Sequence, residues 1–217
     1  MITNTILVLL GICLAFVLWQ MLRRPKSSGA KVTALPSAGT SAVAGSGAEL
    51  WNAKVGDVVS IQGAAEDFSD LDFTVGERNA YEGMNRRWID LGGDFRGRRV
   101  HLEISRASGT EIMGLLEPRR LTLPEAGLTE DQLADLDARQ DASASIQFEG
   151  KPWQYESSHE LAYFESEGQE PKGMYRWLFA ERGGPRLLCV EKWEGEPFNV
   201  RLARKLNPQD ITVYRAA

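Results

Sequence analysis

Two tryptophan–arginine pairs are the first residues in this 217-residue chain whose types and spacing suggest chemistry. Trp88 follows Arg87 in the stretch GMNRRWIDL, and Trp177 follows Arg176 in the similar stretch GMYRWLFAE. Two exposed tryptophans would form a paired recognition surface for a ligand or a peptide. Two buried ones would instead be equivalent core anchors in repeated sheets. The repetition favours the core role, and these four residues are the candidate binding residues.

Each tryptophan is followed by a glutamate at a similar distance along the chain. Glu103 lies 15 positions after the first tryptophan, and Glu191 lies 14 positions after the second. Across each hairpin these carboxylates could pair with Arg87 and Arg176. Such pairs at a protein surface contribute only about 0.2–1 kcal/mol each.

The residue types that usually carry catalysis or bind metal ions predict no reaction. His101 and His159 are the only histidines and lie far apart in sequence, which favours surface or hydrogen-bonded side chains. The acidic stretch AEDFSDLD, residues 65–72, lacks EF-hand spacing, so a solvated loop is favoured over a calcium site. Cys13 and Cys189 have no metal-binding spacing, and no nucleotide or nucleophile motif occurs. We predict no catalytic residue, metal ion or cofactor, which favours a non-enzymatic role and leaves an enzyme open.

The first 24 residues predict a single-pass transmembrane anchor with a basic flank. The run ILVLLGICLAFVLWQML, together with the neutral residues before it, is long enough to span a hydrocarbon core of roughly 30 Å. Positive charge follows the run in RRPK, whereas a cleaved signal peptide carries it in front. By the positive-inside rule the C-terminal domain lies in the cytoplasm. A cleaved signal, a buried core helix and an inverted, periplasmic orientation are the alternatives.

The chain after the anchor divides into a linker and an acidic domain. Residues 25–48 form a flexible Ala/Gly/Ser linker, and residues 49–217 form the domain. The whole chain has 25 basic and 30 acidic residues, and four of the basic residues precede Glu49. The domain therefore has 21 basic against 30 acidic residues, a charge of about −9. This charge excludes nucleic acid as a partner and disfavours an anionic membrane surface.

The domain pattern predicts a mainly β fold with two related halves, about 50–125 and 143–217. Both tryptophan stretches lead through a glycine-rich turn into an apolar strand, which is typical of a hairpin. In the first hairpin Val100, Leu102 and Ile104 alternate with polar residues. We expect two related antiparallel β-units, barrel- or sandwich-like, with chance similarity as the alternative explanation.

The connector between the halves contains the clearest helix signal. Thr129 and Gln132 have the spacing of a capping box, which predicts a helix near 129–140. Leu133 and Leu136 give this helix a narrow apolar stripe for packing on a sheet. The preceding stretch EIMGLLE, residues 111–117, fits either a strand or a short helix.

The order of the motifs VGDVVSI, FTV, YEG, RRWIDL, WQYE and LAYFES resembles the bacterial domain-of-unknown-function family 4178, over roughly residues 50–214. The resemblance implies an all-β domain with repeated strands, found in some cases near small membrane proteins and polyamine-type enzymes. It implies no activity and brings no catalytic residue with it. The anchor lies outside the matched region.

Together these patterns predict a membrane-tethered, cytoplasm-facing binding or scaffolding domain of a bacterial membrane-associated assembly. The membrane is contacted through the N-terminal helix, and a protein partner is expected at the membrane. The alternative is an enzyme accessory subunit, or an enzyme with a site in the groove between the halves. Polar groups with shifted pKa values around a pocket would favour the enzyme, and an exposed apolar patch would favour the binding domain.

Overall fold

The computed structural model describes residues 42–44, 47–106, 109–117, 119–166 and 169–216. The predicted anchor, residues 1–24, and most of the predicted linker lie outside these ranges. At the end of that linker, Ala42–Ala44 form strand β1, which pairs with the last strand of the chain. No helix within the described ranges has the length and hydrophobicity needed to cross a bilayer.

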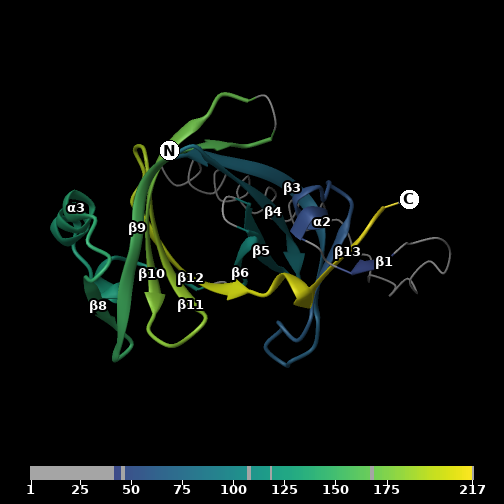
Figure 1. Cartoon of the computed structure of the whole chain (residues 1–217), viewed down its shortest axis with the longest axis horizontal. Coiled ribbons are helices and arrows are strands. Elements are labelled where there is room, and N and C mark those ends of the chain that lie inside the picture. The colour runs from purple at the N-terminus through teal and green to yellow at the C-terminus, as the bar shows by residue number, and fades with distance from the viewer. Residues whose placement is uncertain (1–41, 45–46, 107–108, 118, 167–168, 217) are drawn as a thin grey trace, which may run out of the picture. The chain divides into compact units, whose positions relative to one another are not determined.

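The described part of the chain is mainly antiparallel β structure, as the alternating pattern predicted (Figure 1). Two α-helices are described, α2 (Gly47–Trp51) and α3 (Glu130–Arg139). The strands after β1 are β2 (Val58–Ile61), β3 (Leu71–Gly83), β4 (Arg86–Phe95), β5 (Arg98–Ser105), β6 (Glu111–Leu115), β7 (Arg120–Leu121), β8 (Ser145–Phe148), β9 (Lys151–Phe164), β10 (Lys172–Glu181), β11 (Arg186–Trp193), β12 (Phe198–Leu206) and β13 (Ile211–Tyr214). The ambiguous stretch 111–117 is thus a strand, β6.

The strands form two meanders that join into a closed ring. Consecutive strands pair from β2 to β6, and again from β8 to β12. The meanders meet twice, because β6 pairs with β12 and β3 pairs with β9. The ring therefore runs β3–β4–β5–β6–β12–β11–β10–β9 and back to β3. Whether the two meanders arose by duplication stays a prediction.

Two hydrophobic cores lie against the outer face of this ring. On one side Val100, Leu102 and Ile104 of β5 pack with residues of α2, β2 and β13. On the other side Leu188 and Val190 of β11 pack with residues of α3 and β8. The alternate residues of the same strands face the inside of the ring, and many of them are polar.

Helix α3 closes the second core as the sequence predicted. The Thr129 side chain accepts a hydrogen bond from the Gln132 backbone, and the Gln132 side chain accepts one from the Thr129 backbone. These bonds satisfy two donors that the first helical turn leaves free. Leu133 and Leu136 are buried on the sheet side, and the Leu133 carbonyl accepts a hydrogen bond from Trp177 Nε1 at 3.0 Å.

Candidate ligand-binding cleft

A buried ion network lies inside the ring and joins the two meanders. Arg176 of β10 donates to both carboxylate oxygens of Glu103 on β5, at 2.6 and 2.9 Å. It also donates to Glu191 on β11 at 2.8 Å. The second oxygen of Glu191 accepts from Arg201 of β12 at 2.6 Å. Arg176 is 8% exposed and Glu103 only 2%, so solvent screens this network weakly.

The pKa values in the network show how strongly it depends on its cations. Burial raises the pKa of Glu103, and the Arg176 charge opposes this rise. Burial would also raise the pKa of Glu191, but Arg201 and Arg176 together lower it. The difference arises because Glu191 has two guanidinium partners and Glu103 has one.

A second set of hydrogen-bonded polar side chains, on β3, β4 and β5, lies beside this network. Both carboxylate oxygens of Asp90 lie 3.2 Å from His101 Nδ1, and one of them accepts from the Asn79 amide at 3.2 Å. Burial would lower the pKa of His101, but the hydrogen bond and charge of Asp90 raise it. His101 is therefore a hydrogen-bonded interior histidine, as the sequence favoured.

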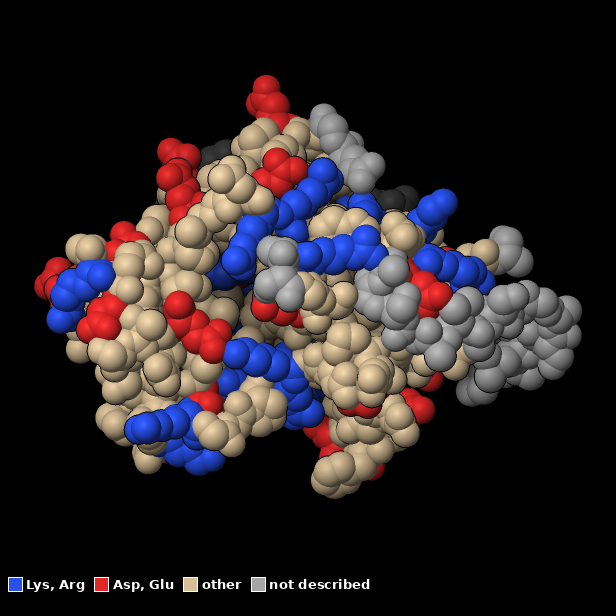
Figure 2. All heavy atoms as spheres, viewed as in Figure 1, with Lys and Arg blue, Asp and Glu red and all other residues tan. Residues whose placement is uncertain are grey.

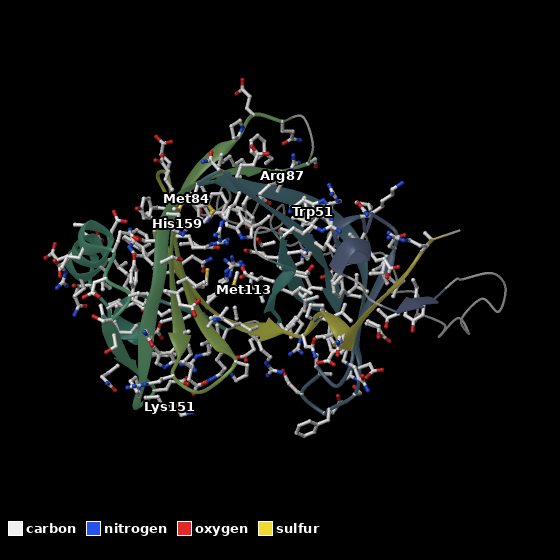
Figure 3. All side chains as sticks on the ribbon, viewed as in Figure 1. Trp51, Met84, Arg87, Met113, Lys151 and His159 are labelled. Atoms are coloured by element: carbon white, nitrogen blue, oxygen red, sulfur yellow. The ribbon has the colours of Figure 1, made fainter. Side chains whose placement is uncertain are left out.

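A cleft of about 920 Å³ opens beside this network, with residues of both meanders around it. One wall comes from β9 and β10, and the other comes from β5, β6 and the end of β12. Figure 2 shows a hollow in the middle of this face, with Lys and Arg side chains on two sides of it. In Figure 3 His159 lies on the β9 side and Met113 on the β6 side. The lining is mixed. Its larger apolar side chains are Trp88, Ile112, Met113, Leu161, Leu178, Leu187 and Leu206, and polar or charged residues make up the rest with Ala142, Tyr155, Ala180 and Gly183.

Two buried polar atoms in the lining of the cleft have no hydrogen-bond partner among the described residues. They are the hydroxyl of Ser105, a residue that is 3% exposed, and the Nε of Arg176. A buried donor left without an acceptor costs about 1–3 kcal/mol. The lining therefore offers hydrogen bonds that the protein itself does not use.

The rim of the cleft carries further charged and titratable groups. Arg86 and Arg182 are exposed, and neither side chain has an ion-pair partner within the described ranges. His159 is half-buried, and its pKa is lowered first by burial and then by the charge of Arg86. Lys205 differs, because it pairs with Glu156 at 2.7 Å. The rim thus presents two cations that are available to a ligand.

The four residues singled out in the sequence lie in four different environments. Trp88 is half-buried in the cleft wall, while Trp177 is 7% exposed in the core under α3. Arg176 is the centre of the buried network, while Arg87 is exposed and pairs with Glu82 at 3.3 Å. The prediction of equivalent tryptophans is therefore wrong, and the pairing of Arg176 is not a surface pair.

The register of the two hairpins explains why the tryptophans differ. Glu103 lies opposite Asp90, which is two residues after Trp88 and shares its face. Glu191 lies opposite Arg176, which directly precedes Trp177. Because side chains alternate along a strand, a one-residue difference in spacing places the tryptophans on opposite faces. The sequence already shows this difference, because the tryptophan-to-glutamate spacing is 15 positions in the first hairpin and 14 in the second.

Comparison of the chain with family models, with curated proteins and with solved structures finds no match in any of the three. Among the described residues, no group of three or more His, Cys, Asp or Glu side chains is placed to hold a metal ion. A functional argument therefore rests on the cleft and its chemistry.

Proposed function

We propose that this chain is a single-pass, membrane-tethered and cytoplasm-facing domain that binds a small molecule in the cleft. The observation that carries the proposal is an open cleft with apolar side chains in its lining and two buried donors without acceptors. Binding sites for small molecules typically combine apolar walls with a few placed polar groups, within roughly 300–1,000 Å³. The cleft fits this description in size, and its lining combines apolar side chains with more polar and charged groups than is usual.

The carboxylates around the cleft favour binding over catalysis. Both oxygens of Glu103 are held by Arg176. Glu181 accepts from Arg186 and Lys151, which lower its pKa to about 2. A carboxylate whose oxygens are both occupied by cationic donors is poorly placed to accept or deliver a proton.

The enzyme alternative rests on His159. Its lowered pKa keeps the imidazole neutral near pH 7, so it can accept a proton, and it faces the cleft. His159→Gln should leave ligand binding within about threefold of the unchanged protein if the domain only binds, since the amide keeps a polar side chain there. A ligand that the unchanged protein converts and the His159→Gln protein binds unconverted would establish the enzyme instead.

Photochemical labelling tests the binding proposal in the full chain. The unchanged protein in lipid nanodiscs is irradiated with a neutral long-chain alcohol that carries a diazirine, and the adducts are mapped by peptide mass spectrometry. We expect adducts to concentrate on the cleft segments 154–161 and 176–183. Ala180→Phe, which fills the cleft, should reduce them about tenfold, while Ala138→Phe on the exposed face of α3 should not.

Leu178→Trp is the second cleft-filling variant, and circular dichroism checks that each variant is folded. Adducts scattered over the surface would overturn the binding proposal. Cleft adducts that persist in both filled and folded variants would overturn it as well.

The location is proposed from the N-terminal sequence alone. An alkaline phosphatase fused after Ala217 should be inactive and a fluorescent protein fused there should fluoresce, because positive charge follows the apolar run. An active phosphatase fusion would place the domain in the periplasm. A protein partner at the membrane and the relation to the family 4178 are part of the same proposal.

A further inference from the structure

The two ends of the cleft differ in chemistry. At one end the β4–β5 register places Trp88 opposite Ser105, and the β9–β10 register places His159 opposite Arg176. Glu103 lies two residues before Ser105 and on the same face of β5. Its ion pair with Arg176 therefore brings the Trp88–Ser105 pair close to the His159–Arg176 pair. Arg86 is near enough to His159 to lower its pKa. We call Arg86, Ser105 and Arg176 the head subsite, and His159 lies beside it.

The head subsite offers mainly hydrogen-bond donors. Arg86 and the Nε of Arg176 can only donate, and the Ser105 hydroxyl can donate as well. Ligand groups that accept several such bonds at once are oxyanions, above all carboxylates. A ligand amine or ammonium group would bring further donors to a place that already has too many.

The charges around the head subsite are nearly balanced, so the preference for an acceptor rests on the unused donors. The positive charges of Arg176 and Arg201 are matched by those of Glu103 and Glu191, so the buried network sums to zero. Arg86 adds a positive charge at this end, and Glu111, which lies opposite Ser105 in the β5–β6 register, adds a negative one. Glu111 lies exposed at the same rim and has an interaction of its own.

Beyond the head subsite an apolar stretch of the cleft follows β10, and the charged residues Glu156, Glu181, Arg182 and Lys205 line the cleft farther along. After Arg176, the residues of β10 that line the cleft are Leu178, Ala180 and the last residue of the strand, Glu181. Leu187 of β11 and Met113 of β6 pack with Leu178 and Ala180 in one apolar cluster. Arg176 to Ala180 spans about 13 Å at the usual rise of a strand. The side chains between Arg176 and Glu181 carry no charge, so this stretch suits a short hydrocarbon chain.

We infer that the cleft binds a single-chain aliphatic carboxylate, with its carboxylate in the head subsite and its chain against Leu178 and Ala180. This inference rests on the proposed binding function and adds the class of ligand and its direction. The carboxylate accepts from Arg86, Ser105 and Arg176 and thereby satisfies the two buried donors. The chain covers the apolar stretch between the two meanders.

A matched set of photoreactive probes tests the ligand class. A diazirine-bearing fatty acid is compared with the alcohol and the primary amine of the same chain, each with the full-length protein in nanodiscs. We expect the acid to label the segment 176–183 about tenfold more than the alcohol, since hydrogen bonds to a charged group contribute about 1.5–3 kcal/mol. The amine should label it less than the alcohol.

Variants of the head subsite separate head recognition from chain binding. Arg86→Gln should lower labelling by the acid about tenfold and leave labelling by the alcohol unchanged. Ser105→Ala, which removes the hydroxyl with little change in volume, should act in the same direction. Arg204→Gln is the control, because Arg204 is an exposed β12 arginine next to the cleft residue Lys205 and has no ion pair within the described ranges.

The outcomes distinguish this inference from the binding proposal. Equal cleft labelling by acid and alcohol, still blocked by Ala180→Phe, would refute the carboxylate and keep the binding function. Preference for the amine, or an Arg86→Gln protein that labels with the acid like the unchanged protein, would refute it too. No labelling of the cleft by any of the three probes would refute both.

Discussion

Removal of Arg176 should destabilise the domain in a way that depends on pH. In Arg176→Met, Glu191 keeps Arg201 at 2.6 Å, whereas Glu103 loses the cation that bonds both its oxygens. Breaking a buried ion pair in this manner costs about 3–5 kcal/mol. The stranded carboxylate can escape part of this cost by binding a proton. Protonating a carboxyl group with the ordinary pKa of 4.5 at pH 7 costs about 3.4 kcal/mol, because each pH unit above the pKa adds about 1.4 kcal/mol.

The proton uptake gives the prediction its direction. In the variant the pKa of Glu103 rises further above 4.5, since burial remains and the opposing Arg176 charge is gone. When the pKa of a carboxyl group is higher in the folded than in the unfolded state, the folded state gains stability as the pH falls toward the unfolded pKa. The free energy lost in Arg176→Met should thus shrink by up to about 2.7 kcal/mol between pH 7 and pH 5.

Urea unfolding of the full chain in a non-ionic detergent, followed by tryptophan fluorescence, measures both quantities. Arg87→Met is the matched control from the similar sequence stretch, because its pair with Glu82 is nearly half exposed on both sides. It should change stability by about 0–1 kcal/mol at either pH. An Arg176→Met protein as stable as the unchanged one, or equally destabilised at pH 7 and pH 5, would refute the account of the buried network.

Two further stability predictions follow from single side chains. Trp177→Ala should cost about 3–5 kcal/mol of stability, because it leaves a cavity in the core under α3 and removes the hydrogen bond to the Leu133 carbonyl. Trp88→Ala should cost clearly less, because Trp88 is only half-buried. Equal shifts of the two melting temperatures would contradict this. Glu181, whose pKa the Arg186 and Lys151 contacts lower to about 2, stabilises the fold above its ordinary value of 4.5 and loses that effect as the pH falls toward 2. The melting temperature of Glu181→Gln should therefore lie below that of the unchanged protein at pH 6 and approach it near pH 2, unlike the exposed control Glu165→Gln.

Local patterns in the sequence predicted the local structure well. The capping box at Thr129 and Gln132 gave the start of α3, because cap bonds form between residues three positions apart. The alternation of Val100, Leu102 and Ile104 gave both the strand and its core-facing side. These signals depend on neighbours in the chain, which a single sequence displays directly.

The site could not be predicted in the same way, because its contacts are long-range. Arg176 and Glu103 are 73 positions apart, and only the closure of the ring brings them together. The polar alternation at His101, Glu103 and Ser105 was visible, but a polar face usually indicates solvent. Trp177 and Trp88 were misjudged because sequence similarity does not record which face of a strand points inward.

The position of the cleft follows from how the two meanders use their faces. Each meander buries one face of its strands in a core of its own, with α2, β2 and β13 on one side and α3 and β8 on the other. Ring closure then encloses the opposite faces together, which carry smaller apolar clusters beside the charged network. The enclosed charges must pair because an isolated buried charge is costly. Charge pairing fixes directions and separations, so the enclosed polar side chains cannot fill the interior as apolar side chains would. The space that remains beside the Arg176 network is the cleft, bordered by the unused donors of Ser105 and Arg176.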